Sequence, residues 1–306
     1  MDLLVLVAQL ALALLVAPLL NGVIKAFKAA WQNRQGPGIV QPWYDVLKYL
    51  NRESVISEHA SWIYRVTPYV YFGAHLAAAG MVPMFVARTP LTSVGDAIVL
   101  VGLFALARFA LSLAALDTAS NFGGMGTSRE LAFASLAEPA LMLGIFALAV
   151  PAGSTAMDRL VGGTVSAAPI LAFGALFIVA IAETGRIPID NPDTHLELTM
   201  AHEGMILEYS GRPLGLLLWA GHVKQLVILS LLAALFFPAG IAQAATPALL
   251  MVGLLAYLVK VTILGLALGL VETSMAKLRI FRVPELLGAA SLLGLMAVAA
   301  TYVVGG

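Results

Sequence analysis

Long runs of apolar residues recur along the whole chain and restrict its fold more than any other feature. Each run reaches about 18 residues or more, which is enough for a helix to cross a hydrocarbon core of roughly 30 Å. The expected spans are residues 3–26, 67–87, 96–116, 131–151, 165–184, 214–237, 247–270 and 286–304. The sequence therefore predicts one integral membrane domain over residues 1–306, an all-α bundle of about eight transmembrane helices.

Composition excludes several classes of function. Only 11% of the residues are charged, whereas a soluble domain has about a quarter. The formal net charge is zero, which gives no reason to expect a nucleic-acid partner. The chain has no cysteine, which excludes disulfides and clusters held by its own thiolates. If the protein takes part in electron transfer, a partner must carry the electrons.

Basic residues divide unevenly between the two sides of the expected bundle. The connections after odd-numbered spans hold Lys25, Lys28, Arg34, Lys48, Arg52, Arg65, Arg129, Arg186, Arg212, Lys277, Arg279 and Arg282. Those after even-numbered spans hold only Arg88 and Arg159. Because basic loops stay in the cytoplasm, we expect the four basic connections there and both termini outside. Lys25 and Lys28 follow the first apolar run instead of preceding it, so we interpret that run as a retained helix and not a cleaved signal.

The first two basic connections are rich in glycine. In the first, Pro42 opens a short amphipathic helix whose apolar stripe is Trp43, Val46, Leu47 and Leu50. That helix lies on the membrane surface, packs against neighbouring helices or forms the wall of a ligand chamber. The second, residues 117–130, lacks the Gly-Lys-Ser/Thr motif and the preceding strand of a phosphate-binding loop. We expect Ser128 to cap the next helix with Glu130 in its first turn, and a functional role for Glu130 is the alternative.

Arg108, Glu138, Lys224 and Lys260 lie well inside expected spans, away from their ends. Glu138 is roughly two turns inside the fourth span. A charge at that depth is costly unless it faces water or the bundle interior, so it indicates function. The three cations either share that role, extend to the membrane surface or form structural ion pairs. For His75 and His222 we expect hydrogen-bonded core histidines.

The third basic connection contains most of the titratable residues. Asn191 and Pro192 are expected to begin a helix that ends near Gly211. His195 and His202 share one stripe of that helix but lie roughly 10 Å apart, too far to bind one zinc ion, so no metal site is predicted.

Glu197, Glu203 and Glu208 follow in the same connection, with Glu197 and Glu208 on one helix face. Carboxylates beside apolar surface and histidines titrate near neutrality and are able to exchange protons there. The alternative is a solvated docking surface. In the last basic connection, lipid headgroups explain the cations, and Glu272 at the membrane boundary is the candidate that remains.

Five ordered segments together resemble a known family. They are Arg34-Gln35-Gly36-Pro37-Gly38 with Gln41-Pro42, Ser128-Arg129-Glu130 with Glu138-Pro139, Ala182-Glu183-Thr184-Gly185-Arg186-Ile187-Pro188-Ile189-Asp190, Glu208-Tyr209-Ser210-Gly211, and Glu272-Thr273 with Ala276-Lys277-Leu278-Arg279. They are similar to the membrane subunit shared by respiratory complex I and the energy-converting nickel–iron hydrogenases. After Asp190 the chain departs from the more acidic run of complex I. It resembles instead the branch of formate hydrogenlyase, hydrogenase-4 and carbon monoxide-induced hydrogenase.

This resemblance implies a subunit of the cell inner membrane that anchors a peripheral redox arm and couples its electron transfer to movement of H⁺ or Na⁺. It implies no redox centre in this chain, with a nickel–iron centre and iron–sulfur clusters in partner subunits. The implied partners are the hydrogenase large and small subunits, a ferredoxin-like iron–sulfur subunit and antiporter-like membrane subunits. By the same resemblance, Arg34, Glu130, Arg186 and Asp190 belong to a cytoplasmic chamber, and Glu138, Glu183 and Glu208 to an acidic path into the membrane.

Residues chosen for their position in the sequence are added to the expected proton path and to the expected docking side. Glu197, Glu203, Arg108, Lys224 and Lys260 join the expected proton path, and Glu272 joins the docking side. The main alternative function is the quinone-site subunit of a complex I type NADH dehydrogenase. A stand-alone secondary transporter would show internal repeats and interrupted spans, which the sequence lacks. A purely structural anchor is disfavoured by Glu138.

Overall fold

The computed structural model describes residues 2–58, 60–88, 90–91, 95–161, 167–191, 201–243 and 246–304. In these ranges the only β-structure is two isolated bridges, and the regular structure is helical, as the apolar runs predict. The helices are α1 (Asp2–Trp31), α2 (Gln41–Leu50), α3 (Trp62–Met81), α5 (Ala97–Asp117), α6 (Asn121–Ala152), α7 (Met157–Leu160), α8 (Ala167–Glu183), α9 (His202–Ile206), α10 (Gly211–Phe236), α11 (Pro247–Ser274), the 3₁₀ turn η1 (Ile280–Arg282) and α12 (Val283–Val304).

Six helices of the described residues are long and apolar enough to cross a membrane, namely α1, α5, α6, α10, α11 and α12 with its preceding turn. α3 and α8 occupy the second and fifth expected spans. The first of them has 20 residues but includes polar side chains such as Arg65 and His75, and α8 has only 17 residues. The chain is therefore a multi-pass membrane protein, and the total of eight spans stays a prediction.

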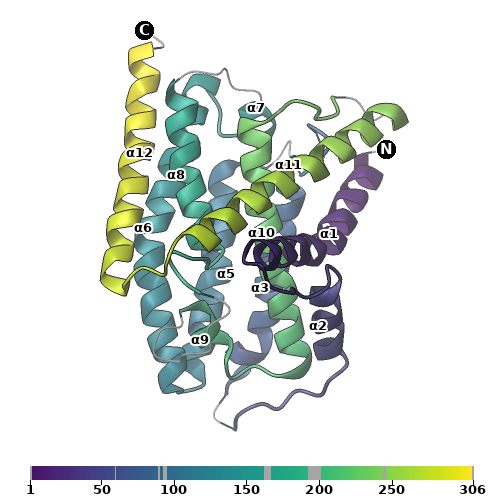
Figure 1. The fold of residues 1–306 in the computed structure, drawn as a ribbon, viewed down its shortest axis with the longest axis vertical. Helices are drawn as coiled ribbons and strands as arrows, with labels where there is room; N and C mark the ends of the chain where they lie inside the picture. The colour runs from purple at the N-terminus through teal and green to yellow at the C-terminus, as the bar shows by residue number, and fades with distance from the viewer. Residues whose placement is uncertain are drawn as a thin grey trace.

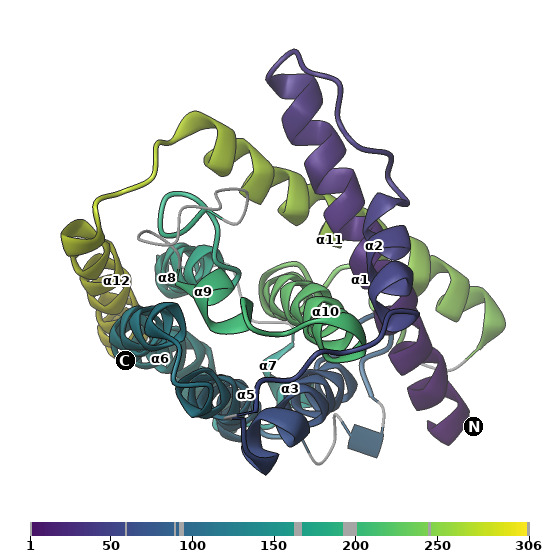
Figure 2. The ribbon, with the colours of Figure 1, turned by 90° about the horizontal axis from the view of Figure 1, so that it is seen from below.

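The helices surround α10, which is the most buried of the six candidate spans. Viewed from below, α3, α5, α6 and α8 lie around α10, while α1 and α11 cross one side of the bundle obliquely (Figure 2). α12 packs against α6 and α8 at the opposite edge (Figure 1). Side chains of α10 are thus within reach of most other helices, and polar ones there must find partners.

The short helix α2 packs on the bundle. Its Val46 is fully buried, and Trp43 donates a hydrogen bond to the Leu15 carbonyl (3.0 Å) while its ring meets Trp219 edge to face. Tyr44 is exposed, and so is Leu47, although Leu47 belongs to the expected apolar stripe. Of the three interpretations left open, packing against neighbouring helices is the one observed for the Trp43 and Val46 face, and α2 contributes no residue to the lining of the cavity described below.

The second expected span, 67–87, is wrong at both ends. α3 begins at Trp62 and stops at Met81, because Pro83 lacks the N–H and the backbone freedom that a further turn needs. The apolar residues that follow are buried but extended. They pair with the segment after α10 through hydrogen bonds of 3.0 Å between Ala242 and the backbone of Phe85 and Ala87.

The glycine-rich segment before the fourth expected span is helical and not a loop. α6 begins at Asn121, so Ser128 does not cap it and instead donates to the Met125 carbonyl, and Glu130 is not in a first turn. Glycine is present because of packing. A Cβ on Gly123 would lie 2.6 Å from the Ala115 carbonyl oxygen, so a larger residue would push α5 and α6 apart.

The helix expected between Asn191 and Gly211 is only partly open to comparison, since residues 192–200, with His195 and Glu197, lie outside the described residues. The described residues of this segment do not form one continuous helix. α9 covers only His202–Ile206, and Gly211 begins α10 instead of ending a helix.

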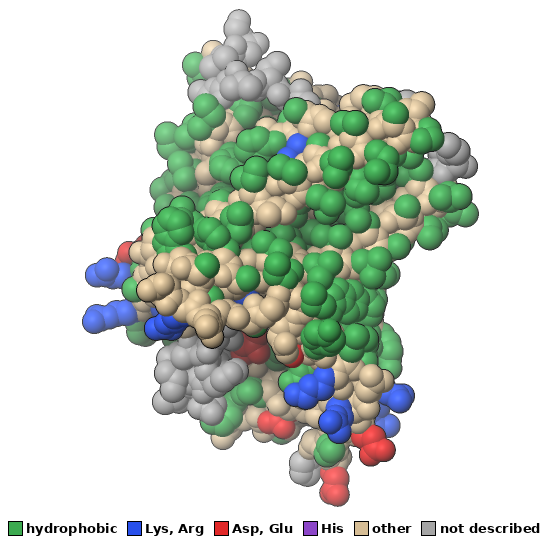
Figure 3. Space-filling model, turned by 45° about the vertical axis from the view of Figure 1, so that its right-hand side comes forward, with side chains coloured by type: hydrophobic (Ala, Val, Ile, Leu, Met, Phe, Trp, Pro, Cys, Tyr) green, Lys and Arg blue, Asp and Glu red, His purple; other side chains and the backbone are tan. Residues whose placement is uncertain are grey.

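Charged and apolar side chains separate on the surface. Hydrophobic side chains dominate the upper half of the face in Figure 3, and most acidic and basic ones gather in its lower half. Helix α1 begins and helix α12 ends towards the upper end, opposite α2 and α9 (Figure 1). This arrangement agrees with the orientation expected from the basic residues, which remains a prediction.

Candidate functional site

A row of charged side chains crosses the bundle through four helices. Its centre is Arg108 on α5, whose guanidinium donates one hydrogen bond to Glu138 on α6 and another to Glu183 at the end of α8. Glu183 continues the row to Lys224 on α10, 2.8 Å away. Glu130, two turns before Glu138 on α6, approaches the Arg108 Nε at 3.7 Å. We call these five residues the ion row.

Burial changes along the ion row. The side chains of Glu183 and Arg108 are only 3% and 6% exposed, whereas that of Glu138 is 36% exposed. A buried charge is tolerated only when it is paired and hydrogen-bonded, and the two bonds from Arg108 meet that need. The row is therefore enclosed at its centre and reaches the surface of the chain at Glu138.

A tight turn after α8 separates the ion row from a second charged cluster. Gly185 has φ of +58°, the left-handed conformation that commonly ends a helix, and the Arg186 N–H bonds back to the Ile181 carbonyl. Arg186 thus points away from Glu183. Its guanidinium bonds Glu272 on α11 (2.8 Å) and Gln225 on α10 (3.0 Å).

Glu272 connects the helices that cross the side of the bundle. Its carboxylate is fully buried and also accepts a hydrogen bond from Lys28 on α1 at 2.5 Å. Asn21 on α1 accepts from Arg186 at 3.2 Å. Nearby, Asp190 is buried, forms an ion pair with Lys277 at 2.8 Å and accepts from the Ala201 N–H. These contacts hold α1, α11 and the turn after α8 together.

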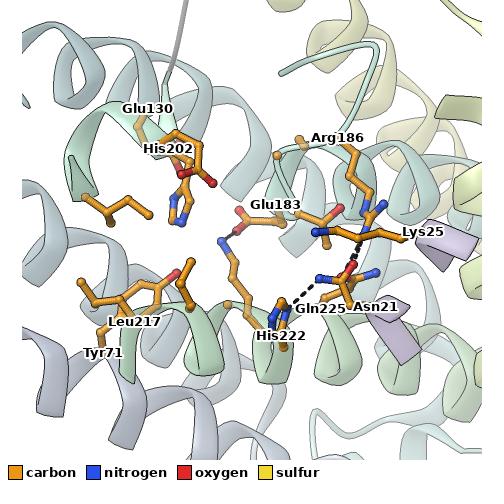
Figure 4. A pocket seen from close by; sticks show the side chains of 18 of the residues that line it. Asn21, Lys25, Tyr71, Glu130, Glu183, Arg186, His202, Leu217, His222 and Gln225 are labelled. Atoms are coloured by element: carbon orange, nitrogen blue, oxygen red, sulfur yellow. Dashed lines mark hydrogen bonds and ion pairs between the residues drawn. The ribbon is translucent and has the colours of Figure 1, made fainter. Parts of the chain in front are cut away.

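A cavity of about 190 Å³ lies between the ion row and the Arg186 cluster. Figure 4 shows Glu130 and His202 towards one end, Arg186, Lys25 and Asn21 towards the other, and Glu183 between them. Its further polar lining includes Lys28, Tyr71, Thr184, Glu203, His222, Lys224 and Gln225. The cavity exceeds the roughly 30 Å³ that one water molecule occupies, so it has room for several.

Most of the expected site residues meet here. Those in the ion row are Glu130, Glu138, Glu183, Arg108 and Lys224, and those near the cavity or the second cluster are Glu203, Arg186, Asp190 and Glu272. Arg34 is instead exposed in the loop after α1 and does not line the cavity. Lys260 lies halfway along α11, and within the described ranges no carboxylate is close enough to pair with it.

Glu208 is also separate from the ion row, because its side chain is exposed. Its motif instead anchors the start of α10. Tyr209 donates to the Tyr64 carbonyl at 2.9 Å, Tyr64 donates to the Glu208 carbonyl at 2.7 Å, and the two rings stack. Burial raises the pKa of the Tyr209 hydroxyl, which therefore stays protonated as a donor.

Sequence reasoning missed several members of the site. His75 is a buried, hydrogen-bonded core histidine as expected. His222 is hydrogen-bonded to Asn21, as expected, but it also lines the cavity, as does His202. Asn21 and Gln225 were missed although each is an uncharged polar residue inside an apolar span, which is the signal that would have identified them. Within the described ranges no three His, Asp or Glu side chains gather as metal ligands.

The chain as a whole is similar to known proteins. The model of the NADH dehydrogenase family matches residues 3–304. The chain belongs to the NADH dehydrogenase family. It is 37% identical to formate hydrogenlyase subunit 4 of Escherichia coli (strain K12), over 89% of each chain. It is 35% identical to hydrogenase-4 component C of the same organism, over 88% of this chain and 86% of the relative.

More distant members of the family include a subunit of the NADH-quinone oxidoreductase of Salinibacter ruber, 28% identical over 73% of this chain and 69% of the relative. The fold resembles a chain in the structure of the membrane-bound sulfane sulfur reductase, an archaeal respiratory membrane complex. That match has a TM-score of 0.83 and 22% identity over 97% of this chain and 99% of the other. These comparisons confirm the family expected from the five sequence segments.

Proposed function

We propose that this chain is the membrane-anchor and ion-coupling subunit of an energy-converting hydrogenase of the formate hydrogenlyase type. Its partners are hydrogenase large and small subunits, a ferredoxin-like iron–sulfur subunit and antiporter-like membrane subunits in the cell inner membrane. It binds the peripheral redox arm on its basic side and links electron transfer there to proton or sodium movement. Nickel–iron and iron–sulfur centres belong to the partners.

The observation that carries this proposal is the ion row. It runs without a break from Lys224, beside the cavity, through Glu183 and Arg108 to the partly exposed Glu138. Pairs of carboxylates and cations inside a membrane bundle are typical of proton relays. The relatives at 37% and 35% identity carry hydrogenase names, which favours this branch over the NADH-quinone oxidoreductase relative at 28%.

The cavity supports the same branch over a quinone-site subunit. Sites for organic ligands measure about 300–1,000 Å³ and are lined mostly by apolar side chains. This cavity measures about 190 Å³, and charged residues such as Lys25, Glu183 and Arg186 line it. A quinone ring would gain little binding free energy among these charged side chains, whereas water molecules and protons interact favourably with them.

The composition of the native complex tests the proposal. The chain, tagged and purified from its own membranes in mild detergent, is expected to bring with it a nickel-containing subunit and to support hydrogen evolution. Elemental analysis of the complex and identification of its subunits provide the readout. A nickel-free complex whose turnover with NADH and quinone is stopped by a quinone-site inhibitor would instead establish the alternative function.

The proposed orientation has its own test. Single cysteines introduced at Gln35 and Asn121, both exposed, are expected to react with a membrane-impermeant maleimide only from the cytoplasmic side. A cysteine at Ser154, just after α6 ends, is expected to react only from the outside. The absence of native cysteine keeps the background low. Labelling of the Asn121 position from outside would refute eight spans with external termini.

A further inference from the structure

The ion row does not balance its own charge. It contains the three carboxylates of Glu130, Glu138 and Glu183 but only the two cations of Arg108 and Lys224, so the fully ionised row has a charge of −3 + 2 = −1. An uncompensated charge inside a bundle is expensive. One proton held within or beside the row removes the imbalance, and Glu130 has the weakest contact with Arg108, at 3.7 Å.

The packing of α9 on α6 places one histidine beside Glu130. A Cβ on Gly126 would lie 2.8 Å from the Ala201 carbonyl oxygen, so only glycine lets α9 approach α6 this closely. Glu130 is four residues after Gly126 and shares that face of α6. His202 directly follows Ala201 and opens α9. Both side chains line the cavity and also the narrow space behind it (Figure 4).

We propose that His202 loads protons into the ion row through Glu130, an inference that rests on the proposed ion-coupling function. The imidazole accepts a proton from a hydronium ion in the cavity, which leaves a water molecule and an imidazolium cation. The imidazolium then transfers that proton to the Glu130 carboxylate, which becomes a neutral carboxylic acid, and the imidazole returns to its neutral form. No electron moves and no bond other than N–H and O–H changes. When His202 is protonated it supplies the positive charge that the row lacks.

The surroundings of His202 suit this exchange. The titratable groups near it come from each bordering helix: Tyr71 on α3, Arg108 on α5, Glu130 on α6, Glu183 on α8, Glu203 on α9 and Lys224 on α10. The ring of His75 packs edge to face on the ring of Tyr71. The buried Tyr71 hydroxyl and Arg108 Nε have no hydrogen-bond partner among the described residues, so donors remain available as the proton moves.

His222 offers a matched control. It lines the same cavity but from the basic end, where its ring is hydrogen-bonded to Asn21 at 2.9 Å. Each alanine variant removes one imidazole ring from the cavity lining, but of the two histidines only His202 also lines the narrow space that Glu130 and Arg108 share. A specific role for His202 therefore predicts different results for the two alanine variants.

The experiment measures membrane potential during hydrogen evolution in vesicles that contain the whole complex. His202→Ala is expected to slow charge translocation about tenfold or more, since a positioned proton carrier contributes at least that much. Added imidazole, which enters the cavity, is expected to restore much of the rate. His222→Ala, whose ring contacts Asn21 and not the narrow space beside Glu130, is expected to show no recovery when imidazole is added.

Three results would overturn the inference: a wild-type rate in His202→Ala, a loss that no imidazole concentration relieves, or an equal recovery of His222→Ala by imidazole. Wild-type translocation that requires Na⁺ at constant pH would also exclude proton loading. If the wild-type complex evolves hydrogen without any charge translocation, the proposed function itself fails. If wild type translocates and only the His202 expectation fails, the proposed function stands.

Discussion

Replacement of Arg108 by methionine is expected to destabilise the chain by about 3–5 kcal/mol, the usual cost of removing one partner from a buried ion pair. Arg108 is 6% exposed and provides the only described cation within ion-pairing distance of Glu138. Without it, Glu183 keeps only Lys224, and Glu138 and Glu130 are left unpaired. The fraction of tagged chain that remains soluble after the purified complex is heated measures the effect.

The matched control is Arg65→Met, since Arg65 is exposed on α3. Its effect should stay within about 0.5 kcal/mol, as for other surface substitutions. The double variant Arg108→Met with Glu138→Gln should recover part of the loss, because it removes one of the stranded charges. Equal heat resistance of wild type and Arg108→Met would show that Arg108 is not essential to the ion row's stability.

Glu138→Gln is expected to leave assembly intact but to abolish ion translocation, with hydrogen evolution uncoupled or slowed. Glutamine keeps the shape and still accepts a hydrogen bond from Arg108, but it no longer binds and releases a proton. Because Glu138 is where the row reaches the chain's surface, loss of its carboxylate is expected to block the proposed transfer to a neighbouring subunit. A vesicle assay of hydrogen evolution with a pH or potential dye, and co-purification for assembly, provide the readout.

Glu208→Gln is the control for the coupling experiment. The family resemblance assigned Glu208 to the same path, but its side chain is exposed and has no ion pair with the row in the described structure. We therefore expect near wild-type translocation in Glu208→Gln. Wild-type translocation in Glu138→Gln would remove Glu138 from the mechanism. Failed assembly of Glu138→Gln would assign Glu138 a structural role.

The sequence alone determined the class of protein and where its charges would matter. Apolar runs long enough to cross a bilayer predict the membrane helices, and α1, α5, α10 and α11 begin or end within a few residues of the expected bounds. Charge is so costly in hydrocarbon that Glu138, Arg108 and Lys224 were recognisable as functional candidates by position only. The family was recognisable too, because its five motifs occur in order.

Only the tertiary structure decided which of these groups meet. Lys28 and Glu272 are 244 residues apart in sequence, and Arg108 and Glu183 are 75 apart, so no periodicity relates them. The packing of tilted helices also separated two residues that the resemblance assigned to one acidic path. Glu183 belongs to the ion row, and Glu208 lies outside it. Likewise, the glycines of α6 suggested a loop because local propensity ignores the neighbours that require them. Hydropathy and propensity act over a few turns of one segment, whereas an ion pair depends on which helices approach one another and on which of their faces.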